Sequence, residues 1–332
     1  MKEVIREHQV DSSLILGENV AVIGYGNQGH AHALNLRDQG VNVVVGARPG
    51  GDSWKQAVVD GFAPLLLEQA VKAADTVMVT LPDEASPDLF KWHIGPHLRP
   101  GQLLMFAHGF LVTFCDPDIP EGVDVGLIGP KGAGRWLRSE YLAGRALAAL
   151  IAVDRDATGT AWERVKSYGW GIGCAKGGLI PTTFREECVT DLFGEQVVLC
   201  GGLPELIKAA FETLTARGYS PEAAYLEVCH EVKLIADLFY EGGLTYMRKR
   251  ISDTAEWGGF TTGPRVINEQ SRAAMNSILD EIESGDFARE WVEEQRTGKI
   301  RLANYREGER SHAIESVGKE VRRDLPNVDE KE

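Results

Sequence analysis

The chain has no excess of positive charge, no long hydrophobic run and no signal-peptide pattern, and each absence excludes a class of protein. Lys and Arg number 35 against 49 Asp and Glu, which gives a net charge of −14. This balance argues against nucleic acid or an anionic membrane surface as a partner. No apolar run reaches transmembrane length, and the first residues lack the apolar core of a signal peptide. We therefore expect a cytoplasmic protein.

Paired cysteine motifs are also lacking. The five cysteines are an odd number without CxxC spacing, at Cys115, Cys174, Cys188, Cys200 and Cys229. Neither a disulfide framework nor a zinc site is indicated, so we expect reduced thiols. The acidic, otherwise ordinary composition fits a metal-dependent enzyme that acts on small metabolites.

The hydrophobic pattern changes in character near residue 182. Before it, short apolar segments typical of strands alternate with helical or turn-rich stretches, at 20–24, 41–46, 75–81, 101–107, 123–129 and 146–153. This alternation predicts a Rossmann-type α/β domain, a parallel sheet covered by helices. After it, helical periodicity takes over, at 183–200, 203–217, 221–241, 264–284 and 286–297. We therefore predict an α/β domain over 1–182 and an all-helical domain over 183–328.

Capping signals support two of these helices. Thr183 with Glu186 forms a capping box that starts the first helix. Ser220 followed by a proline starts another, and the pair Gly242-Gly243 is predicted to end it.

A glycine-rich turn follows the first apolar strand and opens a helix. It reads Gly24-Tyr25-Gly26-Asn27-Gln28-Gly29. In this context the GxGxxG spacing predicts a dinucleotide site, because the glycines permit a tight turn close to the pyrophosphate and the helix N-terminus holds the phosphates. A chance glycine turn is the alternative, and the strand-helix-strand frame makes it the less favoured one.

The loop after the second strand carries two opposed signals about the nucleotide. Arg48 and Ser53 favour NADP, because arginine and hydroxyl groups receive its 2′-phosphate. Asp52 would repel that phosphate if it points inward, and a carboxylate here accepts hydrogen bonds from the ribose of NAD. Asp52 as a solvated turn residue is a further open interpretation. We expect both NADPH and NADH to be used.

Two pairs of carboxylates spaced four residues apart are the strongest chemical signal in the helical half. Asp191 with Glu195, and Glu227 with Glu231, each share one helix face with apolar residues. If these faces are buried, the four charges need a counter-charge, which two Mg²⁺ ions held between facing helices would supply. Solvated surface acids are the usual interpretation of such pairs, but the apolar neighbours favour the metal.

Two further polar residues follow apolar strands of the first domain. His108 and Lys131 stand where strand ends face the ligand crevice. Lys131 is placed to orient a metal-bound carboxylate or water, and His108 is placed to pass protons. A lone histidine is more often structural than catalytic, so position improves both candidates without proving either. Ser252 is an ordinary polar residue on sequence grounds alone.

Taken together, these segments resemble ketol-acid reductoisomerase of branched-chain amino acid synthesis, in its shorter, class I form. The resemblance covers nearly the whole chain. In the first half it rests on Gly-Tyr-Gly-Asn-Gln-Gly-His-Ala-His-Ala at 24–33, Phe-Ala-His-Gly-Phe at 106–110 and Pro-Lys-Gly at 130–132. In the helical half it rests on Asp-Leu-Phe-Gly-Glu-Gln at 191–196, Leu-Cys-Gly-Gly at 199–202, His-Glu-Val-Lys-Leu-Ile at 230–235 and Ser-Asp-Thr-Ala-Glu at 252–256.

The resemblance implies a reaction in two stages that uses two Mg²⁺ ions. An alkyl group first migrates between adjacent carbons of a 2-hydroxy-2-alkyl-3-oxo acid, such as 2-acetolactate or 2-aceto-2-hydroxybutyrate. Hydride from the nicotinamide then reduces the product to a 2,3-dihydroxy acid. Divalent ions suit this chemistry because an uncompensated alkoxide would be very costly.

The resemblance also implies roles for individual residues. The metal ligands are Asp191, Glu195, Glu227 and Glu231. Asp191 would bridge the two ions, Glu231 would also handle a proton, and Ser252 would hydrogen-bond the substrate carboxylate. Gly134, just after the Lys131 loop, joins the residues that contact the nucleotide.

By the same resemblance, the helical domain is knotted and shared between the subunits of a homodimer. Glu227, Glu231 and Ser252 would then complete the active site of the partner subunit. The sequence itself shows neither a knot nor a swap, and it leaves assembly beyond the dimer open.

Some positions depart from the family's usual pattern. They are Leu111 in place of Asn, Ala133 in place of Pro, Arg135 where His is common, Pro181 where an acid is common, and Gly51-Asp52 in a loop that is usually rich in Ser. These changes leave every implied metal ligand in place. They bear on rate and substrate range more than on reaction type.

Two other functions compete with this interpretation. A plain hydroxyacid or imine reductase would share both domains, but it would leave the four carboxylates unexplained and would not need a metal. A nucleotide-sensing protein without chemistry would bind the cofactor without turnover, and the intact acidic pairs argue against it.

Overall fold

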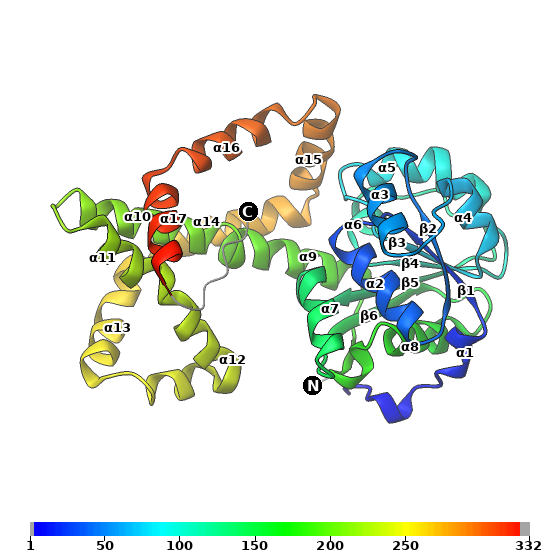
Figure 1. Ribbon diagram of the computed structural model, residues 1–332, viewed down its shortest axis with the longest axis horizontal. Coiled ribbons are helices and arrows are strands. Elements are labelled where there is room, and N and C mark those ends of the chain that lie inside the picture. The colour runs from blue at the N-terminus through cyan, green and yellow to red at the C-terminus, as the bar shows by residue number, and fades with distance from the viewer. Residues whose placement is uncertain (1–2, 326–332) are drawn as a thin grey trace. The chain divides into compact units, whose positions relative to one another are not determined.

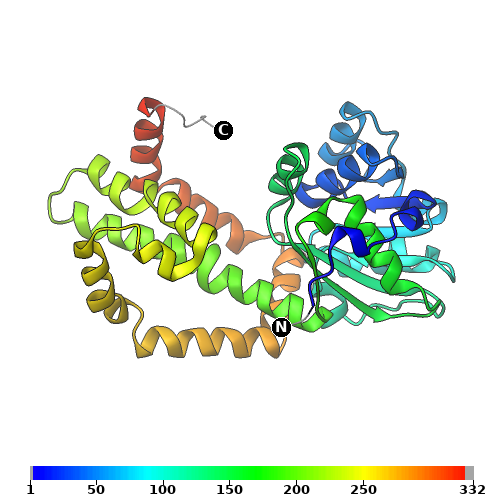
Figure 2. The same ribbon diagram turned by 90° about the horizontal axis from the view of Figure 1, so that it is seen from below.

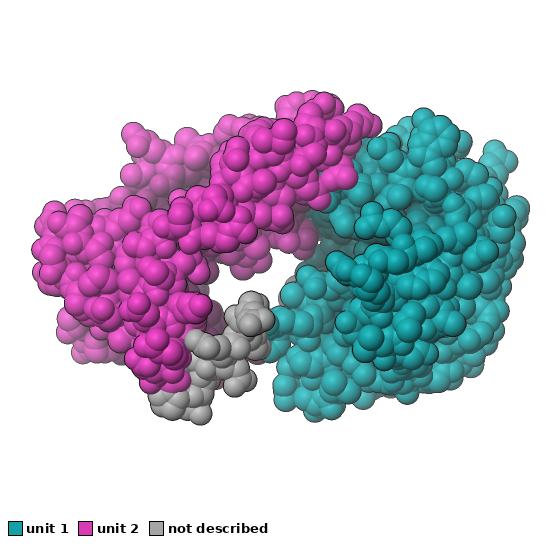
Figure 3. Space-filling view, turned by 45° about the horizontal axis from the view of Figure 1, so that its top comes forward, with its two compact units in different colours: residues 1–190 teal, residues 191–332 magenta. Residues whose placement is uncertain are grey.

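The computed structural model describes residues 3–325 and divides into two compact units. Unit 1 comprises Met1–Thr190 and unit 2 comprises Asp191–Glu332, as Figure 3 shows in separate colours. The expected boundary at 182/183 falls just before helix α9 (Phe184–Gly194), whose first part belongs to unit 1. The expected domain end at 328 lies outside the described residues. Within residues 3–325, none of the helices combines the length and apolarity needed to cross a bilayer.

Unit 1 is built on a seven-stranded sheet in the order β2-β1-β3-β4-β5-β6-β7 (Figure 1). The strands are β1 (Asn19–Ile23), β2 (Asn42–Gly46), β3 (Thr76–Val79), β4 (Leu103–Phe106), β5 (Asp124–Pro130), β6 (Ala149–Arg155) and β7 (Leu179–Pro181). Strands β1 to β5 are parallel, and every residue of β3, β4 and β5 is buried. Burial on both faces is what a parallel sheet covered by helices requires, so the predicted Rossmann-type domain is confirmed.

The last two strands of the sheet run opposite to the first five. Strand β6 pairs antiparallel to β5, with Pro130 opposite Ala149, and β7 pairs parallel to β6, so the prediction of a wholly parallel sheet is wrong from β6 onward. A parallel neighbour needs a connection that returns the chain to the starting edge of the sheet. The connecting helix α7 (Gly134–Leu142) instead packs on α2 (Asn27–Asp38) at the edge where β5 ends, and β6 begins from that same edge.

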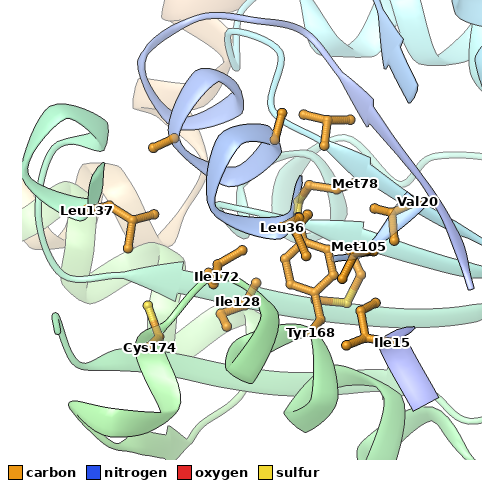
Figure 4. Packing of buried hydrophobic residues seen from close by; sticks show 14 of the residues in the cluster. Ile15, Val20, Leu36, Met78, Met105, Ile128, Leu137, Tyr168, Ile172 and Cys174 are labelled. Atoms are coloured by element: carbon orange, nitrogen blue, oxygen red, sulfur yellow. The ribbon is translucent and has the colours of Figure 1, made fainter. Parts of the chain in front are cut away.

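Two hydrophobic clusters cover the two faces of this sheet, because successive strand residues point to opposite sides. Val20 and Val22 face one cluster, and Ala21 and Ile23 face the other. Figure 4 shows the first cluster, in which Tyr168 of α8 (Ala161–Gly171) packs among residues of the sheet and of neighbouring helices. The remaining helical elements of unit 1 are η1 (Glu7–Gln9), α1 (Ser13–Leu16), α3 (Asp52–Val59), α4 (Leu67–Ala73), α5 (Ser86–Leu89), η2 (Phe90–Ile94), η3 (Gly95–His97), α6 (Phe110–Phe114) and η4 (Cys174–Lys176).

The described part of unit 2 is helical throughout, as predicted. After α9 come η5 (Glu195–Leu199), α10 (Gly202–Thr215), α11 (Pro221–Tyr225), η6 (Leu226–His230), α12 (Val232–Arg248), α13 (Asp253–Val266), α14 (Glu269–Glu283), α15 (Asp286–Arg296), α16 (Ile300–Arg310) and α17 (Ala313–Asp324). The two predicted caps are present: Thr183 Oγ1 accepts from the amide of Glu186 at 3.0 Å, and Ser220 Oγ accepts from the amide of Ala223 at 3.2 Å.

The predicted helix end at Gly242-Gly243 is confirmed, because Gly243 leaves helical geometry with φ 76° and ψ −172°, and α12 joins two helical segments across this kink. The predicted helix start at residue 264 is wrong, because Pro264 lies inside α13 and the next helix begins at Glu269. Asn268 provides the true cap, since its side chain accepts from the amide of Ser271 at 3.1 Å.

The buried core of unit 2 is small. Phe211, Tyr225 and Ile314 bring together α10, α11 and α17, which Figures 1 and 2 show side by side. Long helices elsewhere in the unit expose large apolar side chains: Leu234 is 56% exposed, Tyr240 90%, Leu244 71%, Trp257 72% and Phe260 59%. The helices of unit 2 therefore leave much of the unit's own apolar surface uncovered.

Candidate active site

The glycine-rich turn has the geometry that a dinucleotide needs. Gly24 directly follows β1 and adopts φ +95°, which disfavours any side chain. A Cβ on Gly29 would lie 2.1 Å from the carbonyl oxygen of Gly24, so close helix–strand packing also requires glycine there. Gly26 has open space around its Cα and precedes the first residue of α2. The turn thus leaves room for a pyrophosphate at the N-terminus of α2.

The other residues of the turn connect it to its surroundings. Tyr25 is buried, and its hydroxyl donates to the carboxylate of Asp60 at 3.0 Å; burial and this carboxylate raise the pKa of Tyr25 above its usual value. Gln28 Nε2 donates to the carbonyl of Gly132 at 3.0 Å, and Asn27 is exposed beside it. The side chains of Tyr25 and Gln28 thus hold the turn in place from two sides.

The β2 loop presents its polar groups to solvent. Arg48 is exposed and its guanidinium group folds back near Gly51. Asp52 begins α3 with a fully exposed side chain that lies 3.8 Å from Lys55 Nζ. Ser53 is half-buried next to it.

Lys131 is fixed by a buried acid that the sequence analysis missed. Glu187 of α9 is 1% exposed; its Oε1 lies 3.0 Å from Lys131 Nζ, and its Oε2 accepts from the amide of Gly109 at 3.0 Å. The carboxylate therefore joins the loops after β4 and β5, which carry His108 and Lys131. The one sequence signal for Glu187 is its place four residues before Asp191 on the same helix.

His108 also has partners that the sequence analysis missed. Its Nδ1 lies 2.8 Å from Oδ2 of Asp83, and the Cys188 thiol is a second hydrogen-bond partner. Burial disfavours the charged imidazolium, but these two hydrogen bonds outweigh it and raise the pKa of His108 well above its usual value. Burial in turn raises the pKa of the Cys188 thiol. His108 is thus held as a proton donor to Asp83.

The four acids of the helical half are placed differently from what we expected. Asp191 is half-buried, whereas Glu195, Glu227 and Glu231 are exposed. The expectation that the acidic faces are buried is therefore wrong for this chain by itself. The reason is that few helices of the same unit cover these faces, and Leu199 and Leu234 on them are 63% and 56% exposed.

The chain does not gather these acids into one cluster. Across residues 3–325, no group of three His, Cys, Asp or Glu side chains is arranged to hold a metal ion. Ser252 caps α13, and its Oγ accepts from the amide of Ala255 at 3.2 Å.

Both acidic helices contain a feature that sequence periodicity cannot reveal. Glu195 begins the π-helical turn η5, and Glu227 lies in the π-helical turn η6, after which Glu231 donates its amide to Leu226 at 3.1 Å. Such turns are rare and occur frequently at functional sites. Each acidic pair is thus carried by a locally widened helix.

Two family profiles match the chain, one for each half. The profile described as "Acetohydroxy acid isomeroreductase, NADPH-binding domain" matches residues 14–178. The profile described as "Ketol-acid reductoisomerase, C-terminal domain" matches residues 184–327. Together they cover most of the sequence.

Solved structures give a similar picture. An NADH-preferring ketol-acid reductoisomerase from an uncultured archean is 40% identical, with a TM-score of 0.94 over 98% of this chain and 100% of that one. A semialdehyde dehydrogenase NAD-binding protein from Cupriavidus necator is 19% identical, with a TM-score of 0.61 over 82% of this chain and 99% of that one. A 1-pyrroline-5-carboxylate reductase from Streptococcus pyogenes is 14% identical, with a TM-score of 0.53 over 80% and 98%. The last two show a shared fold alone.

Proposed function

The chain belongs to the ketol-acid reductoisomerase family, and from that premise we propose how its own residues perform the reaction. It is an oxidoreductase with an NAD(P)H-binding domain, and its activity serves branched-chain amino acid biosynthesis. The metal site, the residue roles, the nucleotide preference and the oligomeric state form the proposal. The cytoplasmic location stays a prediction from the sequence.

We propose that two Mg²⁺ ions bind the carboxylates of Asp191, Glu195, Glu227 and Glu231. The donor chemistry fits, because Mg²⁺ prefers carboxylate and water oxygens. The placement on two widened helices also supports the proposal, since Glu195, Glu227 and Glu231 are exposed to solvent there. When bound, the ions would stabilise negative charge on the substrate oxygens during alkyl migration and hydride transfer.

We propose that Lys131 and His108 act from positions fixed by neighbouring acids, the buried Glu187 and the half-buried Asp83. Glu187 directs the Lys131 ammonium group, which is suited to donate hydrogen bonds to a substrate or water oxygen. Asp83 keeps a proton on Nδ1 of His108, so this imidazole is suited to relay protons at the end of β4. The observation that carries these roles is the direct contact of Glu187 with both loops.

Ser252 and Glu231 are proposed to act on the substrate. The Oγ of Ser252 accepts a helix amide, so its own hydrogen is directed elsewhere and suits a substrate carboxylate. Glu231 would accept the proton of the tertiary alcohol while the alkyl group migrates. For the substrates we propose 2-acetolactate and 2-aceto-2-hydroxybutyrate.

The protein is proposed to work as a homodimer with shared active sites. The support is the apolar surface of α12 and α13, where Tyr240, Leu244 and Trp257 are largely exposed. Apolar patches of this kind mark protein interfaces. Glu227 lies in η6 directly before α12, Glu231 caps α12 and Ser252 caps α13, so a second copy that covers these helices would complete the active site.

We propose that the enzyme uses both NADPH and NADH as hydride donors. Arg48 is available to a 2′-phosphate, while the exposed Asp52 at the start of α3 would oppose it. The similar archean enzyme is NADH-preferring. A preference above roughly a hundredfold for either nucleotide, about 2.7 kcal/mol, would contradict this part.

The test follows nicotinamide oxidation with 2-acetolactate and Mg²⁺, with NADPH and NADH side by side and with excess chelator. Turnover that the chelator abolishes supports the proposal, whereas chelator-resistant turnover would indicate a simple reductase. Asp191→Asn should lower turnover by at least about a thousandfold. The same variant should bind NADPH within about twofold of the wild type, because the nucleotide turn lies in unit 1.

A further inference from the structure

An open pocket of about 420 Å³ lies beside the glycine-rich turn in unit 1. Gly26 and Asn27 contribute to its lining, and so do Arg135 and Arg138 of α7. None of the lining residues is an Asp or Glu, although the chain has 49 of them. The pocket lining therefore carries no acidic side chain, although Asp60 lies behind it and contacts Tyr25 and His30. The pocket includes the part of the turn where we place the phosphates.

The position of α7 in this pocket is fixed by close backbone contact. A Cβ on Gly134 would lie 1.8 Å from the carbonyl oxygen of Asn27, so the start of α7 touches the start of α2. The hydrogen bond from Gln28 Nε2 to the carbonyl of Gly132 holds the same two segments together. Arg135, the next residue of α7, is thereby held beside the glycine-rich turn.

The two arginines of the pocket differ in their partners. Arg138 is already neutralised, because its Nη2 lies 2.6 Å from Oδ2 of Asp38 and its Nη1 donates to Asn35 Oδ1 at 2.8 Å. The Arg135 guanidinium stacks 5.0 Å from the ring of Trp136 and has neither a hydrogen bond nor an ion pair with any residue of 3–325. Arg135 therefore keeps its full charge for a ligand.

We propose that Arg135 binds the diphosphate bridge of the nicotinamide dinucleotide. A guanidinium group forms bidentate, charge-assisted hydrogen bonds with phosphate oxygens, and a helix N-terminus attracts the same group. This inference rests on the proposed place of the nucleotide at the glycine-rich turn. Because NADH and NADPH share the diphosphate, Arg135 contributes to the affinity for both, unlike Arg48 at the 2′-phosphate end.

The experiment titrates the intact protein with NADPH and with NADH, without substrate, and follows the fluorescence of the bound nucleotide. Arg135→Ala should raise the Kd about tenfold for both nucleotides, as expected for one charge-assisted contact at an exposed site. Arg135→Lys should recover part of the affinity, because lysine keeps the positive charge but lacks the planar guanidinium group that forms two parallel hydrogen bonds with a phosphate. Arg217→Ala, an exposed arginine in unit 2, is the matched control and should leave both Kd values unchanged.

Three results would overturn the inference. A loss confined to NADPH would assign Arg135 to the 2′-phosphate instead. Unchanged Kd values for both nucleotides, with thermal unfolding like that of the wild type, would leave Arg135 without a role in binding. Failure of the wild type to bind either nucleotide would contradict the proposed nucleotide site itself, and that result is distinct from the other two.

Discussion

The two units differ in how the polar residues of the candidate site are surrounded. In unit 1, the two polar residues at the strand ends have partners within the same unit: Glu187 contacts Lys131, and Asp83 contacts His108. In unit 2 the acids Glu227 and Glu231 are exposed on helices with much apolar surface. Unit 1 therefore pairs these side chains within itself, whereas unit 2 leaves acidic and apolar side chains exposed.

The largest expected effect on activity comes from placing a charge in the apolar surface of unit 2. Tyr240→Glu places a charge on a 90% exposed position of α12. If a second copy covers this face, burying that charge is prohibitive, and the protein should become monomeric. Activity at dilute concentration should then fall at least about a hundredfold, measured beside light scattering.

A matched change in unit 1 serves as the control. Val59→Glu alters a 78% exposed apolar residue of α3 and should leave mass and activity unchanged. A Tyr240→Glu protein that stays dimeric and fully active would remove this surface from the proposed interface.

The next effect comes from the buried acid of unit 1. Glu187→Gln keeps the shape of the side chain but removes the charge that pairs with Lys131. We expect a loss of about 1 to 2 kcal/mol in the free energy of unfolding, because a buried charged hydrogen bond is lost. We also expect kcat to fall at least about tenfold, with the nucleotide Kd unchanged.

The neighbouring Glu186→Gln should change neither quantity, since Glu186 is exposed and a glutamine oxygen can still accept from Thr182. Equal behaviour of the two variants in urea unfolding and in turnover would show that Glu187 does not position Lys131.

The pair of His108 and Asp83 should make stability depend on pH. Despite burial, its hydrogen bonds raise the pKa of His108 in the folded chain. The stabilisation is then fully present below the unfolded pKa, about 6.5, and is lost as the pH rises through the higher folded pKa. The Tm difference between the wild type and Asp83→Asn should therefore shrink as the pH is raised from about 6 to about 10. A Tm difference that stays constant or grows as the pH rises would contradict this prediction.

The smallest expected effect concerns the nucleotide loop. Asp52 is fully exposed, so solvent screens its charge. Asp52→Ser should shift the ratio of NADPH to NADH efficiency towards NADPH by only about two- to threefold. A shift beyond about thirtyfold would mean that Asp52 contacts the ribose directly.

Local chemistry was predictable from the sequence, and long-range pairing was not. Gly24 and Gly29 follow from the turn itself, and the caps at Thr183 and Ser220 follow from the first helical turns. Glu187 was missed because nothing periodic marks its contact with Lys131, which lies far away in the sequence.

The wrong predictions have a common physical cause. The direction of β6 depends on how its connection packs, and the burial of an acidic face depends on what covers it. Strand direction and burial therefore cannot be inferred from the local sequence of the strand or helix alone. The apolar stripe around Glu227 and Glu231 predicted a buried face, but the structure leaves these side chains exposed, with Leu234 on the same face 56% exposed.

The most direct test of a shared active site is subunit complementation. Asp191→Asn and Glu231→Gln proteins, each inactive alone, would be produced together with different tags, and the mixed dimer would be isolated with both tags. If the two acidic pairs of one site come from different subunits, the mixed dimer has one intact site and one doubly altered site, so it should recover about half of the wild-type activity. A mixed dimer that stays inactive would contradict the account, because both pairs would then belong to the same chain.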